Sequence, residues 1–208
     1  MNKESKTIES KVEPGNDFNE LYVKGQLYKD VLSKRIVWEE LEILYNGKLR
    51  TLTTKCGDIA ILTLEIPYKN YKIFLKETDA KPLKILIQLH QTKIPEFNIY
   101  LKDWTNGITS FFGPKIQKTG DRVFDKKYGI QTNEPKEVIK LLNNNNILEN
   151  IVKNELYILD FTHNKTTEFH TLMTVKDRST KDLKTLKELI DLEFIIIDSF
   201  IAQGLICE

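Results

Sequence analysis

Apolar and polar side chains alternate between residues 49 and 103, and this two-residue period sets the fold class of the chain. The region is rich in Ile, Leu, Thr, Tyr and Phe, and breaks interrupt it at residues 56–58, 67, 79–82 and 95. Such runs bounded by turn residues are typical of β-strands. We therefore predict four or five antiparallel strands, of which the clearest are residues 59–66, 71–77, 83–91 and 97–102.

The third of these strands indicates how the sheet is buried. Its alternate positions form an apolar set and a mixed set: Leu83, Ile85, Ile87 and Leu89 against Lys84, Leu86, Gln88 and His90. An antiparallel sheet can bury one face and leave the other in water. We expect one side of this sheet to be core and the other side to be mostly solvated.

A helical arm is predicted before the strands. After a flexible tail of residues 1–15, Asn16 or Asp17 can cap a helix. The positions that follow recur at three and four residues, as on one face of a helix: Phe18, Leu21, Gly25, Tyr28 and Leu32. Trp38, Leu41 and Leu44 or Tyr45 can continue this stripe. Asn46 and Gly47 tolerate a left-handed backbone, so this arm, at about residues 16–46, should end there.

The second half of the chain alternates strands with helices. Residues 124–131 read as a strand that feeds a helix opened by Asn133 and Pro135. Four asparagines at 143–146 compete with helix through bonds to the backbone, so we expect two short helices rather than one. A hairpin is predicted at residues 156–162 and 168–175.

The last predicted helix begins at a Ser179-x-x-Asp182 cap and ends at Gly204. It carries a strong apolar stripe: Leu183, Leu186, Ile190, Phe194, Ile197 and Ile201. This stripe must lie on the sheet or on a partner, and a dimer seam is an equal alternative.

These elements together predict an α+β fold. We expect an antiparallel sheet with an N-terminal helix, a central helix pair and a C-terminal amphipathic helix on one face, in a single domain over residues 16–208. The order of elements, together with the motif Gly120-Asp121-x-x-Phe124-Asp125-x-x-Tyr128 and a helix carrying Leu141-Leu142, resembles an uncharacterised family of bacterial proteins. The resemblance covers roughly residues 83–201. It implies a fold and no known activity, and some members of that family carry membrane helices.

Composition narrows the partners and the compartment. Lys and Arg number 31 against 30 Asp and Glu, a net charge of +1, so no global field attracts phosphate polymers or anionic lipid. Cys56 and Cys207 are far apart, and no secretory signal or run of roughly 20 apolar residues is present. We therefore predict a soluble, cytoplasmic protein without a transmembrane segment or a nucleic-acid partner.

Asp121 and Asp125 are the first candidates for chemistry, because two carboxylates can bind a metal or perform acid and base catalysis. In a strand, residues four apart lie about 13 Å from one another, which is too far for one ion. We favour Asp121 as a turn residue and Asp125 as the ion-pair partner of Lys126, Lys127 or a neighbouring strand.

His163, Glu168 and His170 flank the turn of the predicted hairpin and form the second candidate site. A hairpin centred on Lys165-Thr166 pairs position 163 with 168 and position 161 with 170. These side chains then share one face and can bind zinc, although their spacing is not that of a typical zinc site. The alternative, which we favour, is an exposed hairpin rim.

Other catalytic and cofactor signatures are weak. Cys56 lies in a turn, where His90 can activate it if the fold brings the two together, but an inert cysteine is the simpler interpretation. No Gly-x-Ser-x-Gly motif is present, and Gly107 and Gly113 lack the context of a phosphate loop. We predict no catalytic residue, no metal and no cofactor.

Two aromatic segments can contact a ligand. Basic and aromatic residues interleave in residues 68–76, and such a strand can stack single-stranded bases. The alternative is a two-faced strand in which Tyr71, Ile73 and Leu75 pack while Lys72, Phe74 and Lys76 point outward in part. The apolar cluster Trp104, Ile108, Phe111, Phe112 and Pro114 either recognises a partner or covers the core.

The sequence thus contains a complete set of folding signals and no catalytic signature. We predict a non-enzymatic interaction or accessory protein that contacts another protein, or itself, through the exposed sheet face or the C-terminal helix. The alternatives are a metal-dependent hydrolase that uses Asp121, Asp125, His163, Glu168 or His170, and a membrane-peripheral module, which lacks a basic amphipathic face.

Overall fold

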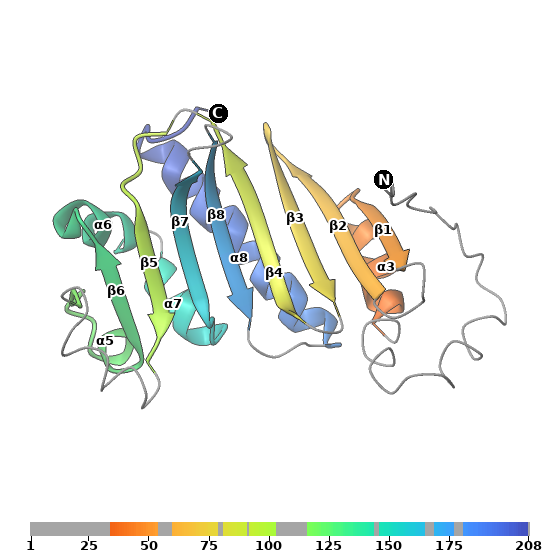
Figure 1. The fold of residues 1–208 in the computed structure, drawn as a ribbon, viewed down its shortest axis with the longest axis horizontal. Helices are drawn as coiled ribbons and strands as arrows, with labels where there is room; N and C mark the ends of the chain where they lie inside the picture. Colours follow the sequence, from red (N-terminus) through yellow and green to blue (C-terminus); the bar gives the residue numbers. More distant parts are fainter. Residues whose placement is uncertain are drawn as a thin grey trace, which may run out of the picture.

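A computed structural model describes residues 34–53, 60–78, 81–90, 92–102, 116–143, 146–164, 169–176 and 181–207. The flexible tail predicted at residues 1–15 and the first half of the helical arm lie outside these residues. The described chain has an α+β fold built on one eight-stranded antiparallel sheet (Figure 1). Its elements in chain order are α3 (Arg35–Leu44), β1 (Lys48–Thr53), β2 (Ala60–Tyr68), β3 (Tyr71–Thr78), β4 (Lys81–Leu89), β5 (Phe97–Leu101), α5 (Arg122–Lys127), β6 (Tyr128–Thr132), α6 (Pro135–Leu142), α7 (Ile147–Lys153), β7 (Ile158–Asn164), β8 (Phe169–Lys176) and α8 (Leu183–Ala202).

The strand order is β1-β2-β3-β4-β8-β7-β5-β6, and every neighbouring pair is antiparallel. The first four strands therefore follow one another across the sheet, whereas the strand predicted at residues 97–102 is β5, which lies between β7 and β6. β8 then pairs with β4, where Leu83 lies opposite Lys176, and β7 and β5 follow. This joint between β4 and β8 unites the two halves of the sheet (Figure 1).

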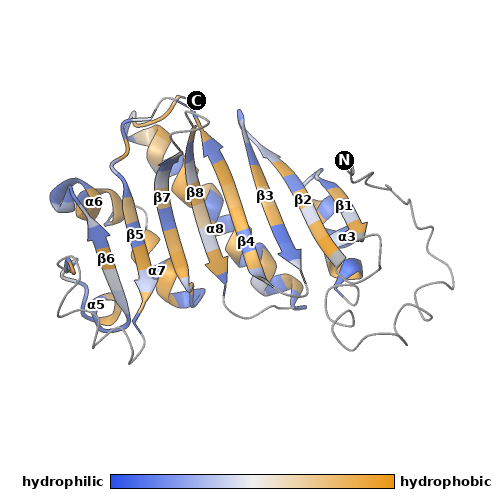
Figure 2. Ribbon diagram, viewed as in Figure 1, coloured by the Kyte–Doolittle hydropathy of each residue, from blue (hydrophilic) through white to orange (hydrophobic). Residues whose placement is uncertain are grey.

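The helices α3, α7 and α8 lie behind one face of the sheet in Figure 1. Burial alternates along the strands in agreement with this layering, because Leu83, Ile85, Ile87 and Leu89 are at most 2% exposed while the positions between them are half-buried or exposed. The hydropathy colouring of Figure 2 shows the same alternation along the central strands. The predicted division into a core face and a solvated face is confirmed, and we call the second one the open face.

Helix α8 covers the middle of the sheet. Asp182 is its N-cap and accepts hydrogen bonds from the main-chain N–H of Thr185 at 3.0 Å and from its hydroxyl at 2.6 Å. The buried face of the helix includes Ile190 and Ile197, which are fully buried. The helix ends before Gly204, whose φ of +65° suits glycine. The apolar stripe therefore packs within this chain, and self-association through α8 stays a prediction.

Helix α3 and the central helix pair agree with the sequence. Trp38 and Leu41 of α3 are fully buried, and the helix ends at Tyr45, just before Asn46 with φ of +49°. The next position, Gly47, requires glycine because an added Cβ would lie 2.9 Å from the Glu65 carbonyl oxygen. Helices α6 and α7 are separate and flank the asparagine run, as predicted.

The strand predicted at residues 124–131 is wrong in its first half. Residues Arg122–Lys127 form the helix α5, and only Tyr128–Thr132 form a strand, β6. The reason is an N-cap, because Asp121 Oδ1 accepts from the N–H groups of Val123 at 2.8 Å and Phe124 at 2.9 Å. The motif at residues 120–128 is thus a capped helix followed by the start of a strand.

Two carboxylates are buried on the helix-covered side of the sheet. Glu77 of β3 accepts a hydrogen bond from Lys34 at 2.8 Å, and both side chains are 2% exposed. Glu193 of α8 is 1% exposed, and neither of its oxygens has a hydrogen-bond partner among the described residues. Burial raises the pKa of Glu193 to about 7, a rise that the nearby Thr174 hydroxyl partly offsets.

Candidate partner-binding face

The open face of the sheet is divided by charge. On β1 to β4 the side chains that the structure describes on this face include five cations, Lys48, Arg50, Lys72, Lys76 and Lys84, and one carboxylate, Glu65. On β8, β7, β5 and β6 the described strand residues of the same face include one carboxylate, Asp160, and no cation. We call the first region the basic half and the second the neutral half.

The centre of the basic half is a pair of lysines that face each other across neighbouring strands. Lys76 of β3 lies directly opposite Lys84 of β4, and Lys76 also lies opposite Thr63, which in turn pairs with Arg50. Neither ammonium group forms a hydrogen bond or an ion pair with any residue in the described part of the chain. Like charges directly opposite one another destabilise a sheet, so the Lys76–Lys84 pair does not stabilise the fold.

The pKa of Glu65 reflects the positive potential around this carboxylate. Its carboxylate accepts from the Lys72 ammonium at 2.8 Å. This hydrogen bond is the main reason why the pKa of Glu65 is lowered, and attraction to Lys72, Lys48 and Arg50 adds to the effect. One carboxylate thus has three cations near it, which leaves a net positive surface.

The neutral half satisfies its own polar groups. Asp160 accepts from the Asn98 amide at 2.9 Å, across the β5–β7 pair. The Tyr100 ring lies over Gly129 of β6, where an added Cβ would come within 2.8 Å of the ring. Because these side chains already have partners or cover one another, this half offers less to a ligand than the basic half.

An apolar band runs from the basic half into the neutral half. Phe74 lies opposite Leu86, and Leu86 lies opposite Met173, in one row across β3, β4 and β8. These side chains are half-buried, and Val175 next to them is buried. A partner that contacts the cations can therefore also bury apolar surface against this band.

The sheet has a notch at one end of the basic half. The β3–β4 ladder stops at Ile73 opposite Ile87. Beyond this pair, β3 continues to Tyr71 paired only with β2, and β4 continues to Leu89 paired only with β8. The described residues around this notch line a pocket of about 520 Å³: Asn70, Tyr71, Lys72, Phe74, Gln88, His90 and Cys207.

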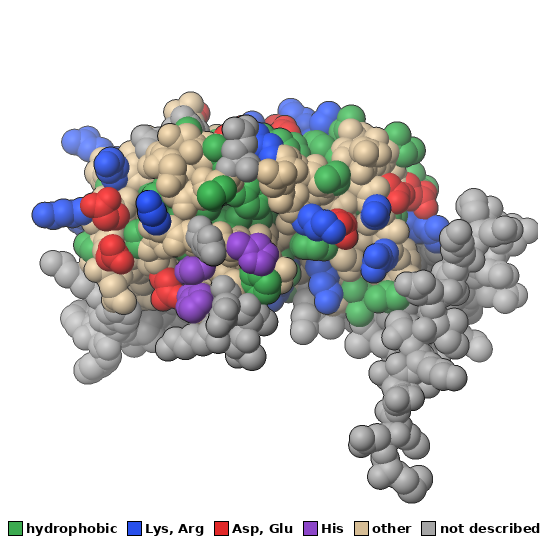
Figure 3. Space-filling view, turned by 90° about the horizontal axis from the view of Figure 1, so that it is seen from above, with side chains coloured by type: hydrophobic (Ala, Val, Ile, Leu, Met, Phe, Trp, Pro, Cys, Tyr) green, Lys and Arg blue, Asp and Glu red, His purple; other side chains and the backbone are tan. Residues whose placement is uncertain are grey.

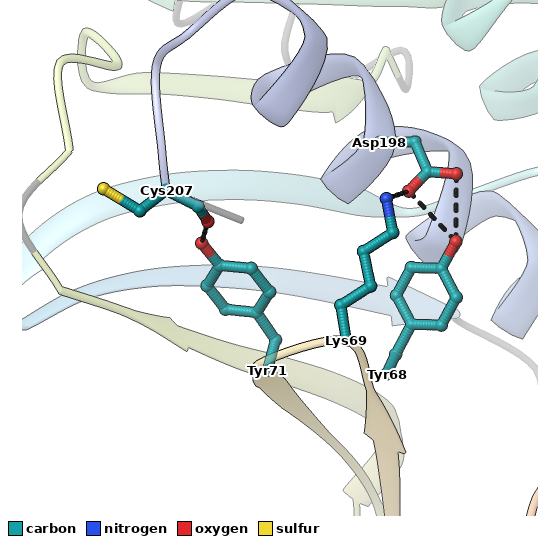
Figure 4. A network of polar contacts seen from close by, with 5 residues as sticks. All are labelled: Tyr68, Lys69, Tyr71, Asp198 and Cys207. Atoms are coloured by element: carbon teal, nitrogen blue, oxygen red, sulfur yellow. Dashed lines mark hydrogen bonds and ion pairs between the residues drawn. The ribbon is translucent and has the colours of Figure 1, made fainter.

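Contacts with α8 and with the C-terminal segment hold the β3 side of the notch (Figure 4). The Tyr68 hydroxyl donates to Asp198 at 2.9 Å, and Lys69 forms an ion pair with the same carboxylate at 2.7 Å. Tyr71 donates to the main-chain carbonyl of Cys207. Burial raises the pKa of both Tyr68 and Tyr71, and Asp198 adds to the rise for Tyr68. The turn between β2 and β3 is thus fixed to the helix layer.

The three histidines of the chain lie close to the notch, at the neighbouring ends of β4, β7 and β8, and Figure 3 views this end of the strands from above. His163 lies opposite His170, with ring centroids 4.6 Å apart, and His90 contacts Phe169 edge to face. The predicted pairing of 163 with 168 and of 161 with 170 is wrong. The hairpin centre lies one residue later, and alternation cannot reveal this shift because it leaves every side chain on its face.

The proposed zinc site has no support in this geometry. Burial, and then repulsion from His163, lower the pKa of His170, while Glu96 opposes this change. Glu96 also accepts from the His163 main-chain N–H at 2.7 Å. Among the described residues, no three His, Cys, Asp or Glu side chains can hold a metal ion. Glu168 lies outside that part of the chain.

Asp121 and Asp125 are occupied by the backbone of their own loop. Asp121 caps α5, and Asp125 accepts from the Thr119 N–H at 2.8 Å, the Thr119 hydroxyl at 2.9 Å and the Gly120 N–H at 3.0 Å. Partial burial alone would raise the pKa of Asp125, but these bonds and Lys102 lower it. Among the described residues, Asp125 forms no ion pair with Lys126 or Lys127. The remaining alternative, a partner from a neighbouring strand, is supported by Lys102, which follows β5 and whose charge lowers the pKa of Asp125.

Other predicted residues fall outside the described chain. Cys56, the suggested partner of His90, and the aromatic cluster between Trp104 and Pro114 are among them. Cys207 is described and exposed. No helix in the described part of the chain is both long and apolar enough to cross a membrane.

The sequence pointed to part of this face. The prediction that Lys72, Phe74 and Lys76 point outward from β3 is confirmed, because Lys72 and Lys76 are exposed while Ile73 and Leu75 are fully buried. The opposition of Lys76 and Lys84 and the notch were missed, since both depend on strand register. The comparisons add no relative: no protein-family model matches the chain, and no curated protein matches it.

Proposed function

We propose that this chain is a non-enzymatic protein-interaction module that binds an acidic segment of another protein on the basic half of its open face. The observation that carries the proposal is the cross-strand pair of Lys76 and Lys84. This pair costs stability where it stands, and an anionic partner would offset that cost. We place the interaction in the cytoplasm.

The surface favours a protein partner over a nucleic acid. Sheets that bind single-stranded nucleic acid use several aromatic platforms for successive bases. The basic half has one aromatic ring, Phe74, which is half-buried beside Leu86 and Met173. An acidic peptide with apolar residues matches this combination of cations and apolar side chains better, and complementary charge gives such a contact its specificity.

The test uses a fluorescein-labelled hexaglutamate peptide with both ends capped, and it measures binding by fluorescence anisotropy at low and at physiological salt. The wild-type protein should bind, and added salt should weaken the binding. The variant Lys76→Gln/Lys84→Gln should bind about tenfold more weakly. The matched control is Lys136→Gln/Lys140→Gln, which removes the same charge from two exposed positions of α6 and should bind within about twofold of wild type.

Two further probes decide between classes of partner. They are an oligothymidylate of twelve nucleotides and vesicles with one-third phosphatidylserine. Tighter binding of either probe than of the peptide, lost in the Lys76/Lys84 variant, would replace the acidic protein segment by nucleic acid or by a membrane surface. Equal loss of peptide binding in the control variant would remove the proposal altogether.

A further inference from the structure

We propose that the notch between β3 and β4 binds the C-terminal carboxylate of the acidic segment, an inference that rests on the proposed function. The notch adjoins the basic half, since Lys72 and Phe74 belong to both. A segment that lies along the cations can therefore reach the notch without leaving the open face.

The lining of the notch matches a carboxylate on an apolar chain end. The described lining residues supply the ammonium group of Lys72, the amides of Asn70 and Gln88, and the imidazole of His90, and they include no Asp or Glu. Phe74 offers an apolar surface for the last side chain. The volume of about 520 Å³ lies within the range of about 300–1,000 Å³ that is usual for ligand sites.

The broken ladder suits the main chain of a peptide. Tyr71 and Leu89 lie beyond the last β3–β4 pair, so each belongs to a stretch of its strand that is paired on one side only. Unpaired strand edges bind peptides by adding main-chain hydrogen bonds. The same edges make a chain end the natural occupant, because a continuous strand would have to pass the segment at Cys207.

The Cys207 contact closes the notch on its far side. Tyr71 belongs to the helix-covered face, and its hydroxyl holds the carbonyl of Cys207 there. Leu205 accepts from the Lys93 N–H at 3.1 Å, and Ile206 is buried, so the C-terminal segment is held by three neighbouring contacts. The Cys207 segment thus bounds the pocket on the helix-covered side, which favours a chain end over a passing chain.

Lys72 can turn to the ligand at low cost. Its present partner Glu65 lies directly opposite Lys48 and is also attracted by Arg50. These two cations continue to compensate the negative charge of Glu65 when the Lys72 ammonium moves to a bound carboxylate. The Lys72 side chain is 64% exposed, which leaves it free to move.

The experiment compares two labelled peptides, each of six glutamates followed by leucine and phenylalanine. One ends in a free carboxylate and the other in a carboxamide. The wild-type protein should bind the free acid about tenfold more tightly than the amide. Lys72→Gln and Gln88→Leu should each remove this preference, whereas Lys76→Gln/Lys84→Gln should weaken both peptides equally and preserve it.

Hydrogen exchange provides a second readout. The free acid should slow exchange in residues 69–73 and 87–90 of the wild-type protein, and the amide should do so less. Equal affinity of the two peptides, with dependence on Lys76 and Lys84 retained, would overturn the carboxylate site and leave the proposed function intact. Failure of both peptides and of capped hexaglutamate to bind would overturn the proposed function and, with it, the site.

Discussion

The two faces of the sheet hold ionisable side chains under opposite conditions. On the covered face, Glu77 is buried in an ion pair with Lys34, and Glu193 is buried without a hydrogen-bond partner among the described residues. On the open face, Lys76 and Lys84 stand opposite one another in contact with solvent. A charge removed from the covered face should change stability, and a charge removed from the open face should change binding. This difference separates residues that maintain the fold from residues that serve a partner.

The largest effect is expected at the buried ion pair. Lys34→Met leaves the Glu77 carboxylate buried without this ammonium, and we expect the free energy of unfolding to fall by about 3 kcal/mol. Urea unfolding measures this loss. The control is Lys153→Met, which breaks the exposed pair of Lys153 with Glu188 at 3.2 Å and should cost about 0.5 kcal/mol or less. Similar losses in both variants would erase the distinction between the two environments.

Glu193 should make stability depend on pH. Its pKa is about 7 in the folded state against 4.5 ordinarily, so the unfolded state releases its proton first as the pH rises. The contribution of this group is fully present below pH 4.5, declines between pH 4.5 and 7, and is lost above that, a total of about 3 kcal/mol. Thermal unfolding of Glu193→Gln at pH 4 and pH 8 tests this. The variant should be more stable than wild type only at the higher pH. A constant difference would show that the pKa of Glu193 is the same in the folded and unfolded states.

A smaller effect is expected at the border of the two faces. Tyr71→Phe removes the hydroxyl that holds the Cys207 carbonyl, and we expect a loss of about 1 kcal/mol. Faster hydrogen exchange in residues 204–207 would accompany it. The control is Tyr157→Phe, at a side chain that is 38% exposed. Unchanged exchange in the C-terminal segment would mean that Leu205 and Ile206 hold it without Tyr71.

The smallest effect on stability is expected on the open face, with an opposite sign. Lys76→Gln/Lys84→Gln removes a cross-strand repulsion and should raise the free energy of unfolding by about 0.5 kcal/mol. The same variant should lose affinity for the acidic peptide. Chemical denaturation beside the anisotropy assay checks both statements, with Lys136→Gln/Lys140→Gln as the control. A destabilised variant would mean that these lysines support the sheet.

Local pattern predicted most of the fold, and it failed where an element is short. The alternation in residues 83–89 and the stripe of α8 span enough residues to define a period, and both were placed correctly. Helix α5 has six residues, fewer than two turns, so its pattern does not differ from that of a strand. The decisive signal is the capping capacity of Asp121, a residue type that is equally common in turns.

The candidate site depends on information that local pattern lacks. Outward-facing Lys72 and Lys76 follow from alternation along β3. That Lys76 meets Lys84 depends on the register of the β3–β4 hairpin, which includes a shift between Lys76 and Thr78. The notch depends on β8 lying beside β4, a pairing between segments far apart in the chain. Alternation shows the face of a residue, but not its neighbour on the next strand.

The place of β8 in the sheet also has a consequence for how the chain folds. β1 to β4 can form in succession through contacts that are close in sequence. β4 can pair with β8 only after the chain as far as residue 176 is available. During synthesis from the N-terminus, β4 therefore waits with one unpaired edge until β8 emerges. An unpaired strand edge is prone to aggregation. The period between the synthesis of β4 and that of β8 is when this protein would depend most on a chaperone.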